Sequence, residues 1–207
     1  MKAKWANDAN TGAAAEVASV ARRWVEKAVI GLNLCPFAGA VHAGNQIRYA
    51  VSFAQTPEAL LEDLVRELIV LEEADPVKIE TTLLIHPLVL NDFADYNGFL
   101  DIVDAAIEEL GLAGVLQVAS FHPQYRFAGT AADDIGNFTN RSPYPMLHLL
   151  REESIERAVQ VHPDTTKIFE QNIETMRRLG RQGWRDLGLE PDRAATPGAS
   201  RPDPGKE

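Results

Sequence analysis

The chain has 207 residues, of which 45% are hydrophobic and 24% charged, a composition typical of one globular domain with enough apolar surface for a core. Aspartate and glutamate outnumber lysine and arginine by 30 to 20, so the formal net charge is −10 at pH 7. This acidic balance argues against nucleic acids and anionic membranes as partners, because both bind basic surfaces.

The N-terminus and the cysteine content bear on localisation. Residues 1–12 lack the apolar core of a signal peptide, and no apolar run reaches the length of a membrane span. The single cysteine excludes an intramolecular disulfide, as expected in a reducing compartment. We therefore expect a cytoplasmic protein, whose oligomeric state the sequence leaves open.

The pattern along the chain predicts a flexible N-terminus at residues 1–12, one globular α/β domain at 13–187 and a disordered tail at 188–207. In chain order, hydrophobic periodicity predicts a helix at 13–32, a strand at 46–53, a helix at 57–74, a strand at 79–85, a helix at 92–110, a strand at 115–121, and helices at 146–161 and 165–184. Thr56 followed by Pro57 predicts the start of the second helix, and Asn91 or Asp92 that of the third.

This alternation of strands and helices predicts the fold class. Helical crossovers between successive strands favour parallel pairing. We expect an α/β domain of two or three layers, with a small three-stranded, mostly parallel βαβαβ sheet and flanking N- and C-terminal helices. The alternative is a ferredoxin-like α+β arrangement, in which a split βαβ unit contains one antiparallel strand.

The stretch from Phe121 to Arg151 stands apart from the periodic segments. Residues 122–146 are irregular and punctuated by glycine and proline, and irregular runs of this length are mostly functional loops or disordered segments. The aromatic residues within it favour a folded loop. Its candidate substrate-binding residues are Tyr125, Arg126, Asn137, Asn140, Arg141 and Arg151.

The cations in this stretch are all arginines, although the chain is acidic. The planar guanidinium binds carboxylate or phosphate through two parallel hydrogen bonds. Arg126, Arg141 and Arg151 therefore suggest a small anionic ligand. In the alternative interpretation the arginines pair internally with acidic neighbours, namely Asp133, Asp134, Glu152 and Glu153.

Two of the predicted strands run directly into a His-Pro pair, at His86 and at His122. If these strands are parallel neighbours, both imidazoles emerge at the carboxyl edge of the sheet, where open α/β sheets bind ligands. With His148, and with Asp133 or Asp134, they could hold a divalent metal such as zinc. The alternative is that each imidazole simply hydrogen-bonds a backbone carbonyl.

Cys35 is the candidate nucleophile. With Pro36 at a first helical position, Cys35 would cap a short turn whose amide groups favour the thiolate. His122 or His148 would complete a Cys–His pair, while His122 with Asp133 or Asp134 would carry out acid–base chemistry. The alternative is a buried, unreactive cysteine beside Phe37.

Three motifs together resemble a known family. They are GLNLCPFA at 31–38, FHPQYRFAGT at 121–130 and DDIGNFTNRSPYPMLHLLRE at 133–152. In these segments the chain is similar to the bacterial family known as domain of unknown function 1415, and the resemblance extends from about Ala13 to Arg181. It implies that the three segments are the signature of that family, but it implies no activity, cofactor or catalytic residue.

These observations leave three functions open. The first is an enzyme, of hydrolase or transferase type, that acts on a small anionic substrate at the carboxyl edge of the sheet. The second is a non-catalytic module that binds a metabolite or a metal. The third is an interaction protein whose loop is ordered only by its own contacts. The glycine-rich phosphate loops G-x-x-x-x-G-K-[ST] and G-x-G-x-x-G do not occur in the sequence.

Overall fold

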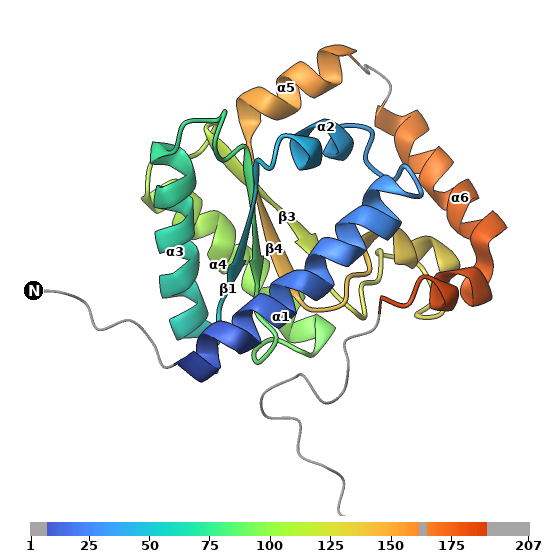
Figure 1. Ribbon diagram of the computed structural model, residues 1–207, viewed down its shortest axis with the longest axis horizontal. Helices are drawn as coiled ribbons and strands as arrows, with labels where there is room; N and C mark the ends of the chain where they lie inside the picture. Colours follow the sequence, from blue (N-terminus) through green and yellow to red (C-terminus); the bar gives the residue numbers. More distant parts are fainter. Residues whose placement is uncertain (1–7, 162–164, 190–207) are drawn as a thin grey trace, which may run out of the picture.

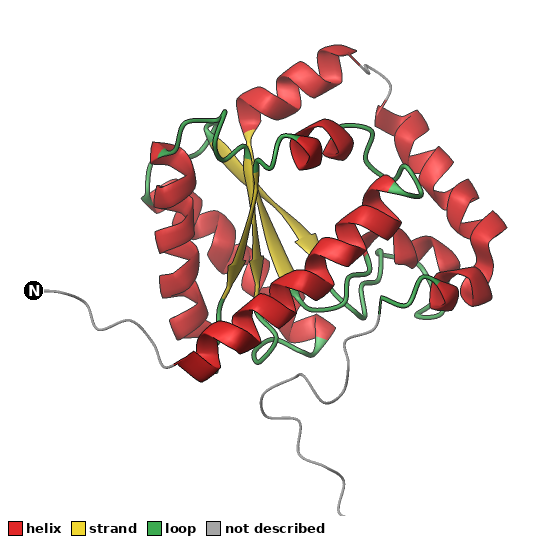
Figure 2. Cartoon of the chain, viewed as in Figure 1, coloured by secondary structure: helices red, strands yellow, loops and turns green. Residues whose placement is uncertain are grey.

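The computed structural model describes residues 8–161 and 165–189, which form one sheet flanked by helices (Figures 1 and 2). The strands are β1 (Ile47–Val51), β2 (Thr81–Ile85), β3 (Leu116–Phe121) and β4 (Met146–Arg151). The helices are α1 (Asp8–Trp24), the π-helix η1 (Val25–Ile30), α2 (Ala38–Ala43), α3 (Pro57–Glu73), α4 (Phe93–Glu109), the 3-10 helix η2 (Ile135–Asn140), α5 (Glu152–Val161) and α6 (Thr165–Asp186). Most of the predicted flexible N-terminus (residues 1–7) and nearly all of the predicted tail (190–207) lie outside the described residues.

The sheet has the strand order β1-β2-β4-β3 and mixed directions. β1 and β2 are parallel, as predicted, whereas β4 runs antiparallel between β2 and β3. The expected three-stranded, mostly parallel sheet is therefore wrong in strand number, because a fourth strand, β4, pairs antiparallel with both β2 and β3. The unit β2-α4-β3 is a βαβ unit split by one antiparallel strand, which was the distinguishing feature of the alternative.

The strand β4 replaces the first part of a predicted helix, since only residues 152–161 of that segment are helical. Its side chains alternate across the sheet. Leu147 and Leu149 face the α3–α4 side, and Met146 packs on the α1 side. Leu147 lies opposite Leu84 of β2, so the strand is buried between two neighbours, where pairing outweighs the helix propensity of methionine and leucine.

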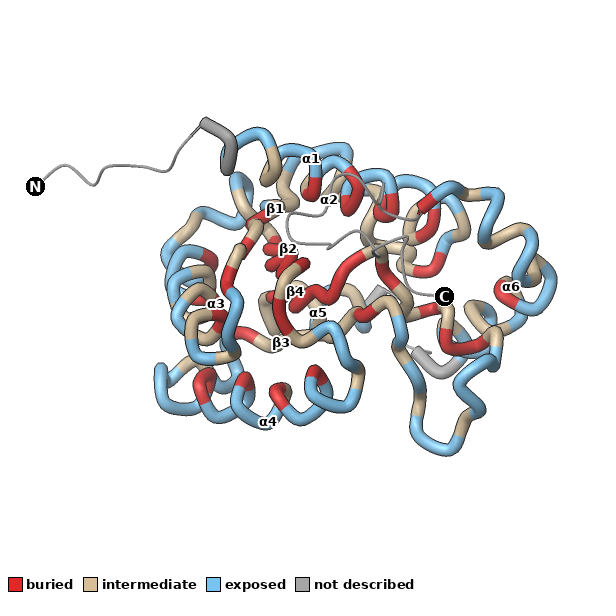
Figure 3. Tube along the Cα trace, turned by 90° about the horizontal axis from the view of Figure 1, so that it is seen from below, coloured by how far each residue is buried: buried red, intermediate tan, exposed pale blue. Residues whose placement is uncertain are grey.

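The helices form layers on both faces of the sheet. α3 and α4 pack on one face through a core that includes Leu60, Leu64 and Tyr96. α1 packs on the other face through Val17, Trp24 and their neighbours. Figure 3 shows the buried strands between α1 on one side and α3 and α4 on the other. Every residue of β2 is buried, as expected for a strand covered on both faces.

The starts predicted for α3 and α4 are confirmed. The Thr56 hydroxyl accepts a hydrogen bond from the Ala59 N–H, and Pro57 occupies the first helical turn of α3. For α4 the cap is Asp92, whose carboxylate accepts from the N–H groups of Ala94 and Asp95. Such caps fix where the connections after β1 and β2 end. None of the helices in the described ranges is long and apolar enough to cross a bilayer.

Candidate functional site

The loop at residues 122–145, called the long loop below, is held in shape by Asn137. This side chain is fully buried. Its carbonyl oxygen accepts from the Phe127 N–H at 3.0 Å and from the Thr130 hydroxyl at 2.8 Å, and its amide donates to the Ala131 carbonyl at 2.9 Å. Because its hydrogen-bonding groups are engaged within the loop, Asn137 shapes the loop, and its predicted contact with substrate is not supported by this placement.

Asn140 and Asp134 also organise the long loop. The Asn140 amide donates to the Ser120 carbonyl of β3 at 3.4 Å, and the His122 N–H donates to the Asn140 carbonyl at 3.3 Å. Asp134 caps η2, since its carboxylate accepts from the Gly136 N–H at 2.7 Å. These contacts join the end of the loop to its beginning and place η2 against α6. Both residues therefore have structural partners.

His86 emerges at the carboxyl end of β2 and is fully buried. Its Nδ1–H donates to the Val89 carbonyl at 3.1 Å, and its ring stacks on Tyr96 with a centroid distance of 5.8 Å. Within the described residues its Nε2 has no hydrogen-bond partner. Burial lowers the pKa of His86 to about 4, because the charged imidazolium would lose its hydration. The imidazole is therefore neutral at pH 7.

His122, at the end of β3, is also fully buried and uses both of its nitrogens. Nε2–H donates to the Leu90 carbonyl at 3.1 Å, and Nδ1 accepts from the Gln124 N–H at 3.0 Å. Desolvation lowers its pKa. The ring packs against Tyr96 and Phe93 of α4. The two His-Pro histidines thus share the α4 side of the sheet edge, where each hydrogen-bonds a backbone carbonyl.

His148 lies apart from these two histidines. It is on β4, on the α1 side of the sheet, near Phe121 and within 2.7 Å of the Thr81 hydroxyl. That hydroxyl donates to the Leu149 carbonyl, so His148 Nε2–H donates to Thr81. The predicted metal ligands His86, His122 and His148 are therefore divided between the two faces of the sheet. Within residues 8–161 and 165–189, no three His, Cys, Asp or Glu side chains are grouped to hold a metal.

Cys35 is half-buried in the turn between η1 and α2. The preceding residue, Leu34, is fixed from two sides, by its N–H to Val29 and by the Asn172 amide of α6, which donates to its carbonyl at 2.8 Å. α2 begins at Ala38, with Phe37 as the N-cap. This places Cys35 on the helix layer of α1, whereas His122 is on the α4 side. His148 lies on the α1 side as well, but its Nε2 is engaged with Thr81. Within the described residues the thiol has no hydrogen bond to either imidazole, so the predicted Cys–His pair is not supported by this placement.

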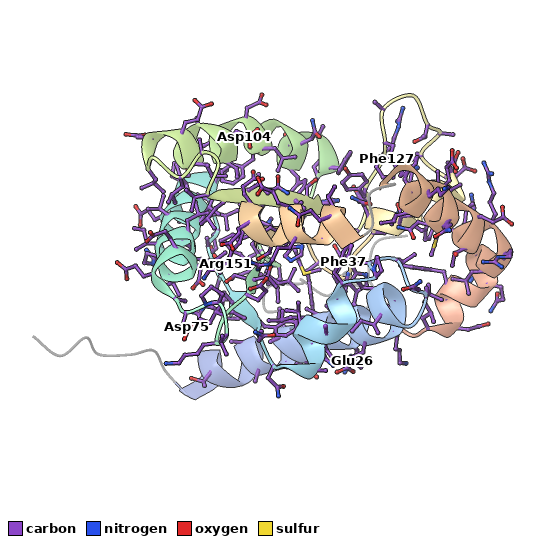
Figure 4. The ribbon with its side chains drawn as sticks, turned by 90° about the horizontal axis from the view of Figure 1, so that it is seen from above. Glu26, Phe37, Asp75, Asp104, Phe127 and Arg151 are labelled. Carbon is purple, nitrogen blue, oxygen red and sulfur yellow. The ribbon has the colours of Figure 1, made fainter. Side chains whose placement is uncertain are left out.

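The three arginines predicted to bind the anion occupy two regions. Arg151 is at the far end of β4, where its guanidinium donates to the carbonyls of Leu71, Ala74 and Ile79 at 2.6, 2.7 and 3.2 Å. It thereby ties the end of α3 to the sheet. Figure 4 shows Arg151 beside α3, well separated from Phe127 in the long loop. Its predicted participation in the same site as Arg126 and Arg141 is not supported by this placement.

Arg126 and Arg141 do lie in the long loop. Arg126 Nε donates to the Thr130 carbonyl at 2.9 Å. Arg141 donates to the carbonyls of Ala132 and Tyr125 at 2.7 and 3.4 Å, and its guanidinium lies 4.1 Å from the centroid of the Phe138 ring. Among the described residues neither arginine is paired with a carboxylate. The internal ion pairs of the alternative interpretation are therefore not what holds these two side chains.

A hollow of about 360 Å³, called the principal hollow below because three arginines line it, opens where α1, the long loop and the end of α6 meet. It is lined by Trp24, Pro123, Phe138, Arg141, Ser142, Pro143, Arg181, Trp184, Arg185 and Leu189. Within the described chain its wall thus combines three guanidinium groups with three aromatic rings. The Trp24 indole N–H donates to the Arg141 carbonyl at 2.9 Å, which fixes α1 to the loop at this wall.

The same segments belong to a known protein family. A family model with the description "Protein of unknown function (DUF1415)" matches residues 16–186. The chain belongs to this family. The resemblance inferred from the three motifs is confirmed, since the matched residues of this DUF1415 protein include all of them. No curated protein and no solved structure matches the chain.

Two arginines that line the principal hollow, Arg181 and Arg185, were not among the residues selected from the sequence. Both follow Gly180, where α6 departs from helical geometry with φ 65° and ψ 175°. Arg181 donates to the backbone carbonyl and the carboxylate of Asp133 at 2.6 and 3.0 Å. Their spacing of one helical turn, with Trp184 between them, is the signal that identifies a cationic, aromatic face. That face was interpreted only as part of an amphipathic helix.

A second hollow of about 390 Å³ adjoins the first in this family member. It is lined by Phe93, Pro123, Gln124, Arg126, Ala132 and Arg141. Pro123 and Arg141 therefore belong to both hollows. Tyr125, also predicted to bind substrate, packs between the rings of Phe127 and of Phe93, which lines the second hollow.

Proposed function

We propose that this protein binds a small organic anion in the principal hollow. The observation that carries the proposal is the wall itself, which combines the guanidinium groups of Arg141, Arg181 and Arg185 with the rings of Trp24 and Trp184. Guanidinium groups bind carboxylate and phosphate through paired hydrogen bonds, and aromatic walls accept the apolar body of a ligand. The volume is in the range of small-molecule sites.

The charge balance of the hollow supports an anionic ligand. Asp133 is paired with Arg181, whereas the partners of Arg141 and Arg185 within the described residues are backbone carbonyls and the Gln182 amide. Burial and the nearby charge of Arg181 lower the pKa of Arg141. Among the described residues, Arg141 and Arg185 thus bring two positive charges without a carboxylate partner to one hollow, in a protein whose net charge is −10. An anion placed between them would relieve this repulsion.

Binding is better supported than acid–base catalysis by His122. A general base needs a free nitrogen within reach of the substrate, but both nitrogens of His122 have backbone partners and the side chain is fully buried. The hydrolase or transferase activity expected from the sequence remains an alternative. Its proposed acid–base residue would first have to leave these hydrogen bonds.

Titration of the full chain with phenylacetate and with phenyl phosphate tests the proposal. The two probes share an aromatic ring and differ in the anionic group, so the comparison also shows which anion is preferred. Binding can be followed by calorimetry and by the fluorescence of Trp24 and Trp184, which line the hollow. Release of phenol from phenyl phosphate would instead favour the hydrolase alternative.

Arg185→Gln is the informative variant, because Arg185 is exposed and its side chain donates to the Gln182 side chain of the same helix. We expect it to weaken binding by about tenfold, the effect of losing one charge-assisted hydrogen bond. Arg177→Gln is the matched control, since Arg177 is an exposed arginine of the same helix outside the hollow. Equal affinity of the two variants, or no binding of either probe by the wild-type chain, would overturn the proposal.

A further inference from the structure

The two hollows are not independent, because Arg141 and Pro123 line both. The principal hollow extends from this shared wall toward α6, with Arg181 and Arg185 at its other side. The second hollow extends toward Phe93 of α4 and contributes one cation of its own within the described residues, Arg126. Each hollow therefore has cationic groups of its own in addition to the shared Arg141.

Arg126 has spare hydrogen-bonding capacity. Its Nε donates to the Thr130 carbonyl at 2.9 Å, which fixes the side chain in the loop. No carboxylate within the described part of the chain neutralises it. A guanidinium has five N–H donors, so the terminal nitrogens remain available to an anion in the second hollow. The Gln124 side chain on the same wall adds a neutral polar group.

We infer that the ligand carries two acidic groups at opposite ends, one received in each hollow, with its connecting part over Arg141 and Pro123. This inference rests on the proposed function and names the class of ligand, an extended organic dianion. A monoanion in the principal hollow would leave Arg126 without a counter-charge, whereas a second acidic group would satisfy it. The shared guanidinium sets the register of the ligand between the two ends.

Calorimetry with the full chain and two matched series of probes tests the inference. The probes are straight-chain monocarboxylates and α,ω-dicarboxylates of equal and increasing chain length. We expect one range of lengths in which the dicarboxylate binds about tenfold more tightly than the matched monocarboxylate, because a second charge-assisted contact forms only when the chain spans both hollows. Equal binding of the two series at every length would overturn the inference.

Variants of Arg126 assign the second contact. Arg126→Gln should abolish the preference for the dicarboxylate and leave monocarboxylate binding unchanged. Arg126→Lys keeps a positive charge without the planar fork, so it should restore part of the preference, whereas a simple change in loop structure would not be restored. Arg177→Gln serves again as the control and should retain the full preference. Weakening of both series to the same extent by Arg126→Gln would contradict the inference.

The outcomes separate this inference from the proposed function. If monocarboxylates or phenylacetate bind and Arg185→Gln weakens them, the principal hollow is an anion site whatever the dicarboxylates do. If the dicarboxylates then show no advantage, only the second acidic group is wrong. If none of the probes binds, the proposed function fails and this inference fails with it.

Discussion

At the scale of single residues, the two buried histidines fix the connection between β2 and α4. His86 and His122 donate to the carbonyls of Val89 and Leu90, and Leu90 adopts a left-handed backbone with φ 57°. A positive φ at a leucine is costly and must be held by its surroundings. The two imidazoles therefore hold this connection in place at the edge of the sheet. This is a structural function for two residues that the sequence suggested as metal ligands and, in the case of His122, as the acid–base group.

His122→Ala is expected to lower the free energy of unfolding by roughly 3 kcal/mol, because it removes two buried hydrogen bonds and leaves a cavity beside Phe93 and Tyr96. Urea denaturation of the purified variant measures the change. His42→Ala is the comparison, since His42 is only partly buried and its partner is Glu26 at 3.5 Å; its effect should be below about 1 kcal/mol. Equal midpoints for the two variants would show that the His122 contacts contribute little.

The location of these histidines could be predicted from the sequence, but their partners could not. Hydrophobic runs that end in His-Pro place both imidazoles at a strand end. The acceptor of His122, however, is the carbonyl of Leu90, which is 32 positions away. Nothing in the residue type of Leu90 indicates a left-handed conformation, because glycine or asparagine is the usual signal. The sequence therefore does not indicate whether these imidazoles are free or hydrogen-bonded to the backbone.

At the scale of elements, sequence periodicity identified three of the strands and most of the helices but not β4. The segment MLHLLR consists largely of good helix formers, and a true helix, α5, follows it directly. Its strand conformation is imposed by β2 and β3, which pair with it on both sides. Long-range pairing of this kind leaves little trace in a short local pattern, and the order of the strands in the sheet could not be predicted for the same reason.

The bend in α6 determines which residues line the principal hollow. Gly180, at φ 65° and ψ 175°, occupies a region that only glycine adopts readily. The part of α6 that follows it carries Arg181, Trp184 and Arg185 to the long loop. Helical spacing indicates that these three side chains share a face of the helix. It does not indicate that this face reaches the long loop, because an uninterrupted helix would continue in a different direction.

Gly180→Ala is expected to destabilise the protein by about 1–3 kcal/mol through backbone strain alone, since no neighbour obstructs an added Cβ. It should also weaken phenylacetate binding, because the second part of α6 would be displaced. Gly98→Ala is the matched control: Gly98 lies inside α4 with open space around it, and alanine there should add roughly 0.5–1 kcal/mol. Thermal unfolding and calorimetry of both variants check these opposite signs, and a stabilising effect of Gly180→Ala would refute the role of the bend.

At the scale of the whole molecule, the desolvated side chains of His86 and His148 make stability dependent on pH. Burial lowers the pKa of His86 and of His148 to about 4, below the value of about 6.5 in an unfolded chain. Between these two values the unfolded chain binds protons that the folded chain does not. The histidine contribution is therefore complete above about pH 6.5 and is lost as the pH falls toward 4.

For His86 alone, the loss amounts to roughly 3 kcal/mol on acidification through this window. His86→Asn tests it, because the asparagine amide can still donate to the Val89 carbonyl but does not titrate in this range. The difference in unfolding free energy between about pH 7 and about pH 5 should be smaller in the variant than in the wild-type chain. An identical difference would mean that His86 does not contribute to the acid sensitivity.

The insertion of β4 has a consequence for synthesis on the ribosome. A nascent chain that ends before Met146 contains β1, β2 and β3, yet β2 and β3 do not pair with each other in the finished sheet. In such a chain one edge of β2 and one edge of β3 lack their partner until β4 has left the exit tunnel. We therefore expect the long loop to be translated before the sheet can close, so that this domain completes its folding late, after most of its length has been made.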